Sequence, residues 1–268
     1  FNPTDKMSGG KISINKNLSD SSNIFLSIAR GFNQGGFNLN LGLAPESNNS
    51  NLYYDPEFLT NYEIGFNSQL FNKMMNVSAV IFYSDRDDQQ VLISTQVDPM
   101  DPNTFSFLTQ NAAEGINKGV ELNLDMELSE SVYFFSRFGL LQTDINNWKS
   151  RPDLEGRAQA HAPKKSFALG INWSITDRAS LSIDLVGKSS FYYSDSHDNQ
   201  SSSYSLTNIN YDYSIGRWTY SIWARNVFDE YYSVRGFYFG NEAPDFQDTL
   251  YERHGDPKHL GFTARYDF

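Results

Sequence analysis

The sequence has no cysteine, only four histidines and few basic residues: 21 lysines and arginines stand against 32 aspartates and glutamates. The absence of cysteine excludes a disulfide scaffold and a thiolate metal site. The net charge of −11 should repel a phosphate backbone, so nucleic-acid binding is not expected. Mean hydropathy is −0.51, and no apolar run approaches the roughly 18 residues that a transmembrane helix needs.

The local signatures of common catalytic and metal sites are also missing. No histidine pair has the i, i+4 spacing of a zinc protease, and no nucleophile elbow marks a serine hydrolase. The polar loop from Asp195 to Asn199 lacks the glycine and the distal glutamate of a calcium-binding helix–loop–helix motif. We therefore expect no enzyme, no resident metal and no cofactor. The given sequence begins at Phe1, with neither a Met nor a charged-then-apolar leader, so we also expect a processed or truncated chain.

Aromatic side chains, by contrast, make up 15% of the residues, and serine and asparagine are abundant. Apolar and polar residues alternate with period 2 over much of the chain, which is typical of strands with one apolar face. The alternation is clearest at 119–128 and at 260–268. Composition and alternation together predict an all-β protein.

The alternating segments predict about eleven strands, many of them about 10 residues long or longer, whereas soluble strands usually run about 5–6 residues and bilayer-spanning strands about 9–11. The predicted ranges are 7–18, 22–34, 58–71, 74–92, 105–128, 131–146, 163–175, 178–193, 203–215, 217–234 and 258–268. Strand length therefore favours a membrane barrel.

The connections between these strands alternate between short and long. Tight turns at 18–22, 71–74, 128–131, 176–178 and 214–217 alternate with long polar loops near 35–57, 93–104, 147–162, 194–202 and 235–257. Such a pattern places every turn at one rim and every loop at the other, as in an antiparallel up-and-down transmembrane β-barrel. We expect the C-terminus at the turn side and residue 1 at the loop side.

The polar faces of the predicted strands carry many charges, which would line a wet barrel lumen or face solvent in a soluble sheet. They are Glu63, Glu121, Asp125, Glu127, Arg137, Asp184, Lys188, Arg225 and Arg265. Tyrosine and tryptophan gather near strand ends, where membrane-interface girdles lie. The last strand carries an aromatic stripe, Phe262, Tyr266 and Phe268, which we interpret as a membrane-assembly signal.

Several motifs, in their order along the chain, resemble those of TonB-dependent outer-membrane receptors. They are RGFNQGGFN at 30–38, YDPE at 54–57, NYEIGF at 61–66, FY at 82–83 with QQV at 89–91, GVEL at 119–122, NVFDEYY at 226–232 and GFTARYDF at 261–268. The order of these motifs is more specific than any one of them. The resemblance covers nearly the whole chain.

This resemblance implies energised uptake of a scarce nutrient across the bacterial outer membrane, most often a ferric siderophore or a similar iron complex. The implied partners are outer-membrane lipids, a small-molecule ligand and the TonB–ExbB–ExbD system, which acts through a plug domain inside the barrel. Barrels of this family have about 22 strands. Residues 1–268 contain about half that number, with no plug-like segment and no TonB-contacting box, so we expect the C-terminal half of one barrel.

Ligand binding is expected in the outer loops and the lumen, where aromatic and charged side chains can hold a polar ligand. The candidate residues are Arg30, Glu63, Tyr192, Tyr193, Asp195, His197, Tyr238, Phe239 and Arg253. For each of them, a structural role in the girdle or in loop packing is the alternative. Two other functions stay open at this point: a soluble, secreted β-rich module that binds a glycan, and a small passive outer-membrane barrel.

Overall fold

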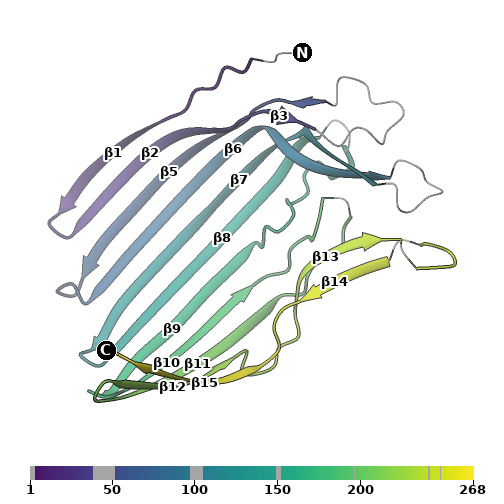
Figure 1. The fold of residues 1–268 in the computed structure, drawn as a ribbon. Coiled ribbons are helices and arrows are strands. Elements are labelled where there is room, and N and C mark those ends of the chain that lie inside the picture. Colours follow the sequence, from purple (N-terminus) through teal and green to yellow (C-terminus); the bar gives the residue numbers. More distant parts are fainter. Residues whose placement is uncertain are drawn as a thin grey trace.

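The computed structural model describes residues 4–38, 52–96, 105–148, 152–195, 197–240, 242–247 and 249–268. Eleven strands form one sheet in chain order, each antiparallel to the next (Figure 1). They are β1 (Gly10–Ser19), β2 (Ser22–Asn33), β5 (Glu57–Leu70), β6 (Met75–Gln96), β7 (Phe105–Ser129), β8 (Val132–Trp148), β9 (Lys165–Thr176), β10 (Ala179–Lys188), β11 (Tyr204–Ile215), β12 (Trp218–Arg225) and β15 (His259–Tyr266). The predicted all-β meander is confirmed.

The long connections contain small elements that period-2 alternation did not predict. Two short hairpins pair β3 (Gly36–Phe37) with β4 (Tyr53–Tyr54) and β13 (Ser233–Phe239) with β14 (Thr249–His254). Within the described ranges, the 3-10 turn η3 spans Pro152–Leu154. No helix in the described ranges has the length and the apolar character needed to cross a membrane.

Two predicted strands were too long. The strand expected at 217–234 ends at Arg225, because Asn226 and Asp229 adopt positive φ angles of 47° and 55° and turn the chain out of the sheet. The strand expected at 178–193 ends at Lys188. The residues beyond Lys188 retain strand-like composition, but they leave the ladder of the sheet: the Tyr193 amide donates to the Asn199 carbonyl within the next loop, and the Tyr192 carbonyl accepts from the His161 amide.

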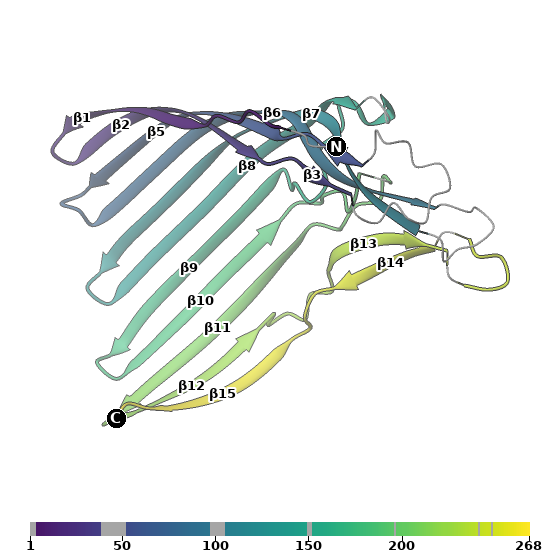
Figure 2. The same cartoon turned by 45° about the horizontal axis from the view of Figure 1, so that its top comes forward.

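Short turns and long loops lie at opposite ends of the sheet (Figure 2). The five tight turns gather at one rim together with the C-terminus, and the N-terminal residues lie at the other rim with both small hairpins. We call these ends the turn rim and the loop rim. At one of the turns, Phe71, Asn72 and Lys73 all have positive φ. The sequence prediction of alternating connections is confirmed.

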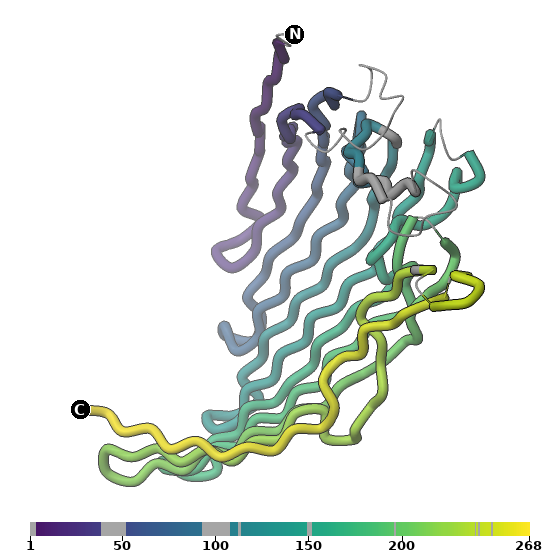
Figure 3. The backbone as a smooth tube through the Cα atoms, turned by 45° about the vertical axis from the view of Figure 1, so that its right-hand side comes forward, coloured from purple at the N-terminus to yellow at the C-terminus, as the bar shows by residue number. Residues whose placement is uncertain are grey.

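The sheet is curved but open within the described residues, where β1 pairs only with β2 and β15 only with β12. Figure 3 shows the strands bent into a trough rather than a closed ring. The chain therefore forms part of a barrel wall.

Strand register separates an apolar face from a polar face. Residues directly opposite each other in an antiparallel pair share a face, which gives a row Leu26, Ile64, Ile81, Val120 and Leu140 on one side. These side chains are exposed, Ile81 by 57%. A row on the other side, about three residues closer to the turn rim, is polar and consists of Asn23, Asn67, Ser78, Asn123 and Arg137.

The nine charged residues predicted on polar faces all share this polar face by register. Two hollows open on it, so the polar face is the concave one. The buried apolar cluster is small and lies at the loop rim, where Ile145, Trp148 and Leu154 pack together with Val91 at their edge. Most of the apolar surface therefore lies on the convex face of the trough and not in a core.

Candidate functional site

The loop rim contains an ordered cluster of side chains from three connections. The first is the β8–β9 connection, which Leu154 anchors in the apolar cluster beside Ile145. The Ile145 amide donates to the Arg157 carbonyl at 3.0 Å, and the Gln159 amide donates to Thr143 Oγ1 at 2.9 Å. These contacts hold Arg157 at a defined place above the strand ends.

The Arg157 guanidinium joins this connection to the loop between β10 and β11. Its Nη2 donates to the carbonyls of Ser194 and His197 at 2.5 and 2.9 Å, and its Nη1 lies 3.3 Å from Asp198 Oδ1. Its Cζ lies 4.0 Å from the centre of the Tyr192 ring, a cation–π contact. The side chain is only 9% exposed. Arg157 is therefore the central cation of the cluster.

Tyr193 connects the same loop to the β13–β14 hairpin. Its ring is 3% exposed and packs edge-on against Phe191, and its hydroxyl donates to Glu252 Oε1 on β14. Burial, followed by the hydrogen bond to Glu252, raises the pKa of Tyr193 to about 12, so the phenol stays protonated at physiological pH. Gly236 permits the close approach, because a Cβ there would lie 2.4 Å from the Tyr193 ring.

His197 contacts the same hairpin through Tyr238. The two rings meet edge-on with centroids 4.8 Å apart, and Asn199 Nδ2 donates to the Tyr238 hydroxyl at 2.5 Å. The backbone amide of Asn199 donates to His197 Nδ1, so the proton of the neutral ring sits on Nε2. Burial and the nearby Arg157 charge lower the pKa of His197, and Asp198 opposes them. The imidazole is therefore neutral at pH 7.

The structure brings five of the nine candidate residues together. Tyr192, Tyr193, Asp195, His197 and Tyr238 lie in this cluster, which we name the rim cluster together with Arg157 and Glu252. Asp195 has a structural contact there, since its Oδ1 accepts from the Ala160 amide at 3.2 Å. The exposed ring of Tyr238 and the half-buried rings of Tyr192 and His197, held in place by the buried Arg157, form a surface suited to a polar ligand with flat groups.

The other four candidates lie elsewhere or have no described side chain. Arg253 is exposed on β14, opposite Arg235, and the side chain of Phe239 lies outside the described residues. Glu63 lies on the polar face and accepts from Ser27 Oγ at 3.0 Å and from Asn61 Nδ2 at 2.8 Å.

Arg30 faces the other way from Glu63. The register of β2 with β5 places it on the apolar face, where its Cζ lies 4.6 Å from the centre of the Phe58 ring. Arg30, predicted at the rim or in the lumen, therefore lies near the loop rim on the apolar face, where its guanidinium covers an aromatic ring.

Sequence reasoning missed Arg157 and Glu252. Both lie in long connections without periodicity, and neither belongs to a motif. Only the folded loops bring Arg157 to the carbonyls of residues about 40 positions further along. Of the three aromatic residues expected as an assembly signal, Phe262 and Tyr266 lie on the exposed apolar face of β15. Phe268 follows the end of that strand, and its ring packs edge-on against Tyr266.

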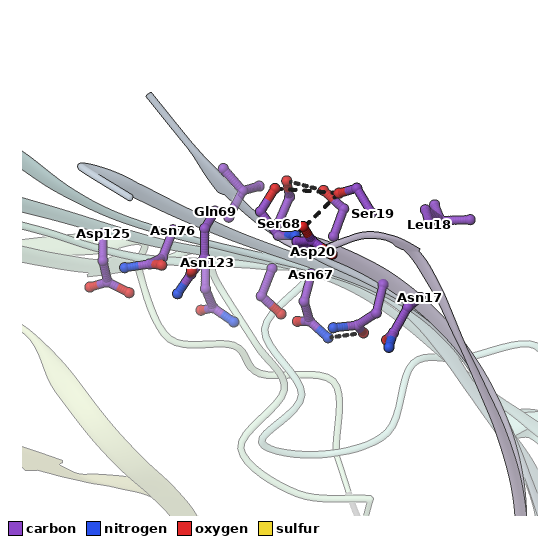
Figure 4. A pocket seen from close by; sticks show the side chains of 15 residues that line it. Asn17, Leu18, Ser19, Asp20, Asn67, Ser68, Gln69, Asn76, Asn123 and Asp125 are labelled. Carbon is purple, nitrogen blue, oxygen red and sulfur yellow. Dashed lines mark hydrogen bonds between the residues drawn. The ribbon is translucent and has the colours of Figure 1, made fainter. Parts of the chain in front are cut away.

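Two hollows lie on the concave face, away from the rim cluster. The larger measures about 740 Å³ and lies beside the tight turns of β1–β2 and β5–β6, lined by amide side chains that include Asn17, Asn67 and Asn123 (Figure 4). Asn67 Nδ2 donates to Asn23 Oδ1 at 3.2 Å across two of these strands. The smaller measures about 480 Å³ and lies among β7 to β11.

Solved structures with the same fold include uptake receptors. The chain is similar to the ferric yersiniabactin uptake receptor FyuA from Yersinia pestis, with a TM-score of 0.78 and 17% identity over 97% of this chain and 37% of that one. It is also similar to the siderophore receptor PiuA from Acinetobacter baumannii, with a TM-score of 0.70 and 17% identity over 95% of this chain and 35% of that one.

The ferric-catecholate import receptor Fiu from E. coli K12 gives a TM-score of 0.70 and 18% identity, over 97% of this chain and 35% of that one. The chain thus spans about a third of the length of these structures. At this identity the likeness concerns the fold.

A family model described as "TonB dependent receptor-like, beta-barrel" matches residues 10–227, which is most of the chain. The match covers ten of the eleven strands of the large sheet. Its members are transport receptors rather than enzymes. The chain belongs to the TonB-dependent receptor β-barrel family and is a bacterial outer-membrane protein.

Proposed function

We propose that this chain forms the C-terminal part of the barrel of a receptor that takes up an iron complex, a ferric siderophore or a chemically similar chelate. The observation that carries the proposal is the rim cluster, where Arg157 Nη2 and the rings of Tyr192, His197 and Tyr238 meet at the loop rim of a barrel wall. Chelates of ferric iron are large, polar and often anionic, and this surface offers them ring faces, such as the exposed ring of Tyr238, on loops that the buried Arg157 holds in place.

The apolar face supports the membrane location. Its exposed aliphatic rows run across the strands in register, as expected for a wall in contact with lipid. In a soluble secreted module the same face would be a large exposed apolar patch. The family and this face both disfavour the soluble alternative.

We further propose that residues 1–268 belong to one barrel portion, completed in the receptor by further strands at the free edges of β1 and β15. An open sheet edge in lipid would leave several backbone groups unpaired, each at a cost of several kcal/mol, so closure is expected. A plug inside that barrel would transmit energy from TonB. The similar structures, of which this chain covers about a third, support this arrangement.

Iron uptake in the source bacterium tests the proposal. The receptor gene is deleted, and uptake of ⁵⁵Fe as citrate, tris-catecholate and tris-hydroxamate chelates is measured in iron-starved cells with and without a protonophore. We expect uptake of at least one chelate to fall 10-fold or more on deletion, to return with the intact gene and to stop with the protonophore.

Two results would contradict the proposal in different ways. Receptor-dependent uptake that continues with the protonophore would indicate a passive barrel. No change for any iron chelate would exclude iron as the cargo, and the same cells would then be tested with cobalamin and haem.

A further inference from the structure

The smaller hollow on the concave face has a shape set by strand register. Glu121, Gly139, Ser166 and Lys188 lie directly opposite one another on β7 to β10. With strands about 4.8 Å apart, the two charged residues are about 14 Å apart at their Cα atoms. The two residues between them are small, so the floor of the hollow is low between two charged sides. We call this hollow the wall pocket.

One side of the wall pocket is aromatic. Tyr204 lies directly opposite Lys188, and the ring of Tyr232, from the segment after β12, lies 4.5 Å from the Tyr204 ring at 35°. Tyr232 is fixed in place: its carbonyl accepts from the Gly255 amide at 2.9 Å, and a Cβ at Gly255 would lie 1.9 Å from its ring. Both rings line the wall pocket, next to apolar groups of Val186 and Leu206.

The charges at the wall pocket are unequally available. Arg137 is engaged, since its Nη2 donates to Asp125 Oδ1 at 2.5 Å and its Nη1 to the Leu124 carbonyl at 2.8 Å. Among the described residues, Lys188 and Glu121 have neither an ion-pair partner nor a side-chain hydrogen bond. The ammonium beside the two tyrosine rings is therefore free to bind a ligand.

We propose that the wall pocket binds a planar aromatic group that bears an anionic oxygen, with its ring against Tyr204 and Tyr232 and its oxygen at Lys188. Aromatic pairs gain about 0.5–1.5 kcal/mol beyond their buried area, and a Lys ammonium acts as a point charge for an anion. At about 480 Å³, the wall pocket has the volume of a small-molecule site. The inference rests on the proposed function, because this group would belong to the transported ligand.

Binding of radiolabelled salicylate to outer-membrane vesicles tests the inference. Vesicles that contain the intact receptor are compared with vesicles from the deletion strain, and cyclohexanecarboxylate serves as an anion of similar size without an aromatic ring. We expect receptor-dependent salicylate binding at least 10-fold tighter than that of cyclohexanecarboxylate. Lys188→Gln should weaken binding of both anions about 10-fold, whereas Tyr204→Leu should weaken only that of salicylate.

Matched control variants lie on the apolar face. Tyr62 and Tyr83 form a similar tyrosine pair there, 6.4 Å apart, and Lys118 lies directly opposite Tyr83. Tyr62→Leu and Lys118→Gln should leave salicylate binding unchanged. Glu121→Gln should strengthen it about 3-fold, because a negative charge is removed from the far side of the pocket.

Three outcomes would overturn the inference: equal binding of the two anions, no receptor-dependent binding, or equal losses in the apolar-face controls. If Tyr204→Leu impairs assembly, seen as loss of the heat-modifiable band, Ser166→Tyr takes its place, because it fills the floor of the wall pocket and should abolish binding.

The vesicles are not energised. Salicylate binding without iron uptake would therefore count against the proposed function alone, and iron uptake without salicylate binding against the wall pocket alone.

Discussion

At the scale of single residues, Arg157 determines how the outer loops are joined. Lysine would keep the charge but not the planar fork that reaches two carbonyls and stacks on Tyr192. Hydrogen bonds to charged groups contribute about 1.5–3 kcal/mol each. We expect Arg157→Lys to speed amide exchange in the loop around Tyr192 at least 10-fold and to weaken binding of the transported chelate. Arg178→Lys, an exposed arginine at the turn rim, is the matched control, and equal effects of both changes would contradict this role.

His197 makes the same loop sensitive to pH. Its pKa lies below the usual 6.5, because burial and the Arg157 charge disfavour the imidazolium. In the opened loop the ring takes up a proton near pH 6.5, but in the closed loop only at lower pH, so closing becomes less favourable as pH falls below about 6.5. Amide exchange at residues 192–195, corrected for intrinsic rates, should therefore accelerate between pH 7.5 and 5.5. His197→Phe keeps a ring against Tyr238 and should abolish this acceleration; if it persists, another group is responsible.

At the scale of elements, the motifs that carried the family resemblance are structural connections. Glu57, in the YDPE motif, accepts two hydrogen bonds from Arg86 at 2.9 and 2.6 Å. Asn226, which opens the NVFDEYY motif, is 4% exposed, and its Nδ2 donates to the carbonyls of Glu230 and Asp256. Its Oδ1 accepts from the Glu230 amide. Glu57 thus joins β5 to β6, and Asn226 fixes where β12 ends and ties that end to the segment before β15.

Asn226→Ala removes all three side-chain bonds and replaces a residue that tolerates positive φ. Leaving buried partners unpaired costs about 1–3 kcal/mol, so we expect the folded, heat-modifiable band to convert to the unfolded band at a temperature several degrees lower. Asn172→Ala is the control, since Asn172 is exposed on β9. Equal shifts for both variants would show that Asn226 is not a structural connection.

At the scale of the whole molecule, the two faces of the sheet decide its environment. Ile81 and Val80 are neighbours on β6 that face opposite sides, Ile81 in the apolar row and Val80 in the row with Glu121. Arginine at a lipid-facing midplane position costs about 2–4 kcal/mol, whereas a lumen-facing position carries no such lipid penalty. In denaturant titrations of the receptor in bilayers, Ile81→Arg should destabilise and Val80→Arg should be nearly neutral. Equal, small effects would contradict a lipid-facing surface.

The sequence alone determined the all-β class, the eleven-strand order, the alternation of turns and loops and the face of the nine charged residues assigned to the polar side. Side-chain direction in a strand alternates with a period of two residues, so these properties depend only on residues that are close together in the sequence. The end of β12 could not be predicted in this way, because it depends on the hydrogen bonds of Asn226 to residues further along the chain.

Only the tertiary structure decided which residues meet at the site. Arg157, His197 and Tyr238 come from three connections without periodicity, and Lys188 meets Tyr204 and Tyr232 only through strand pairing and a segment that folds over the sheet. Contacts between residues far apart in sequence depend on loop closure and register, which no short pattern encodes. The sequence pattern therefore determined a sheet with one apolar and one polar face. Loop folding and strand pairing decided which side chains meet at the proposed binding sites.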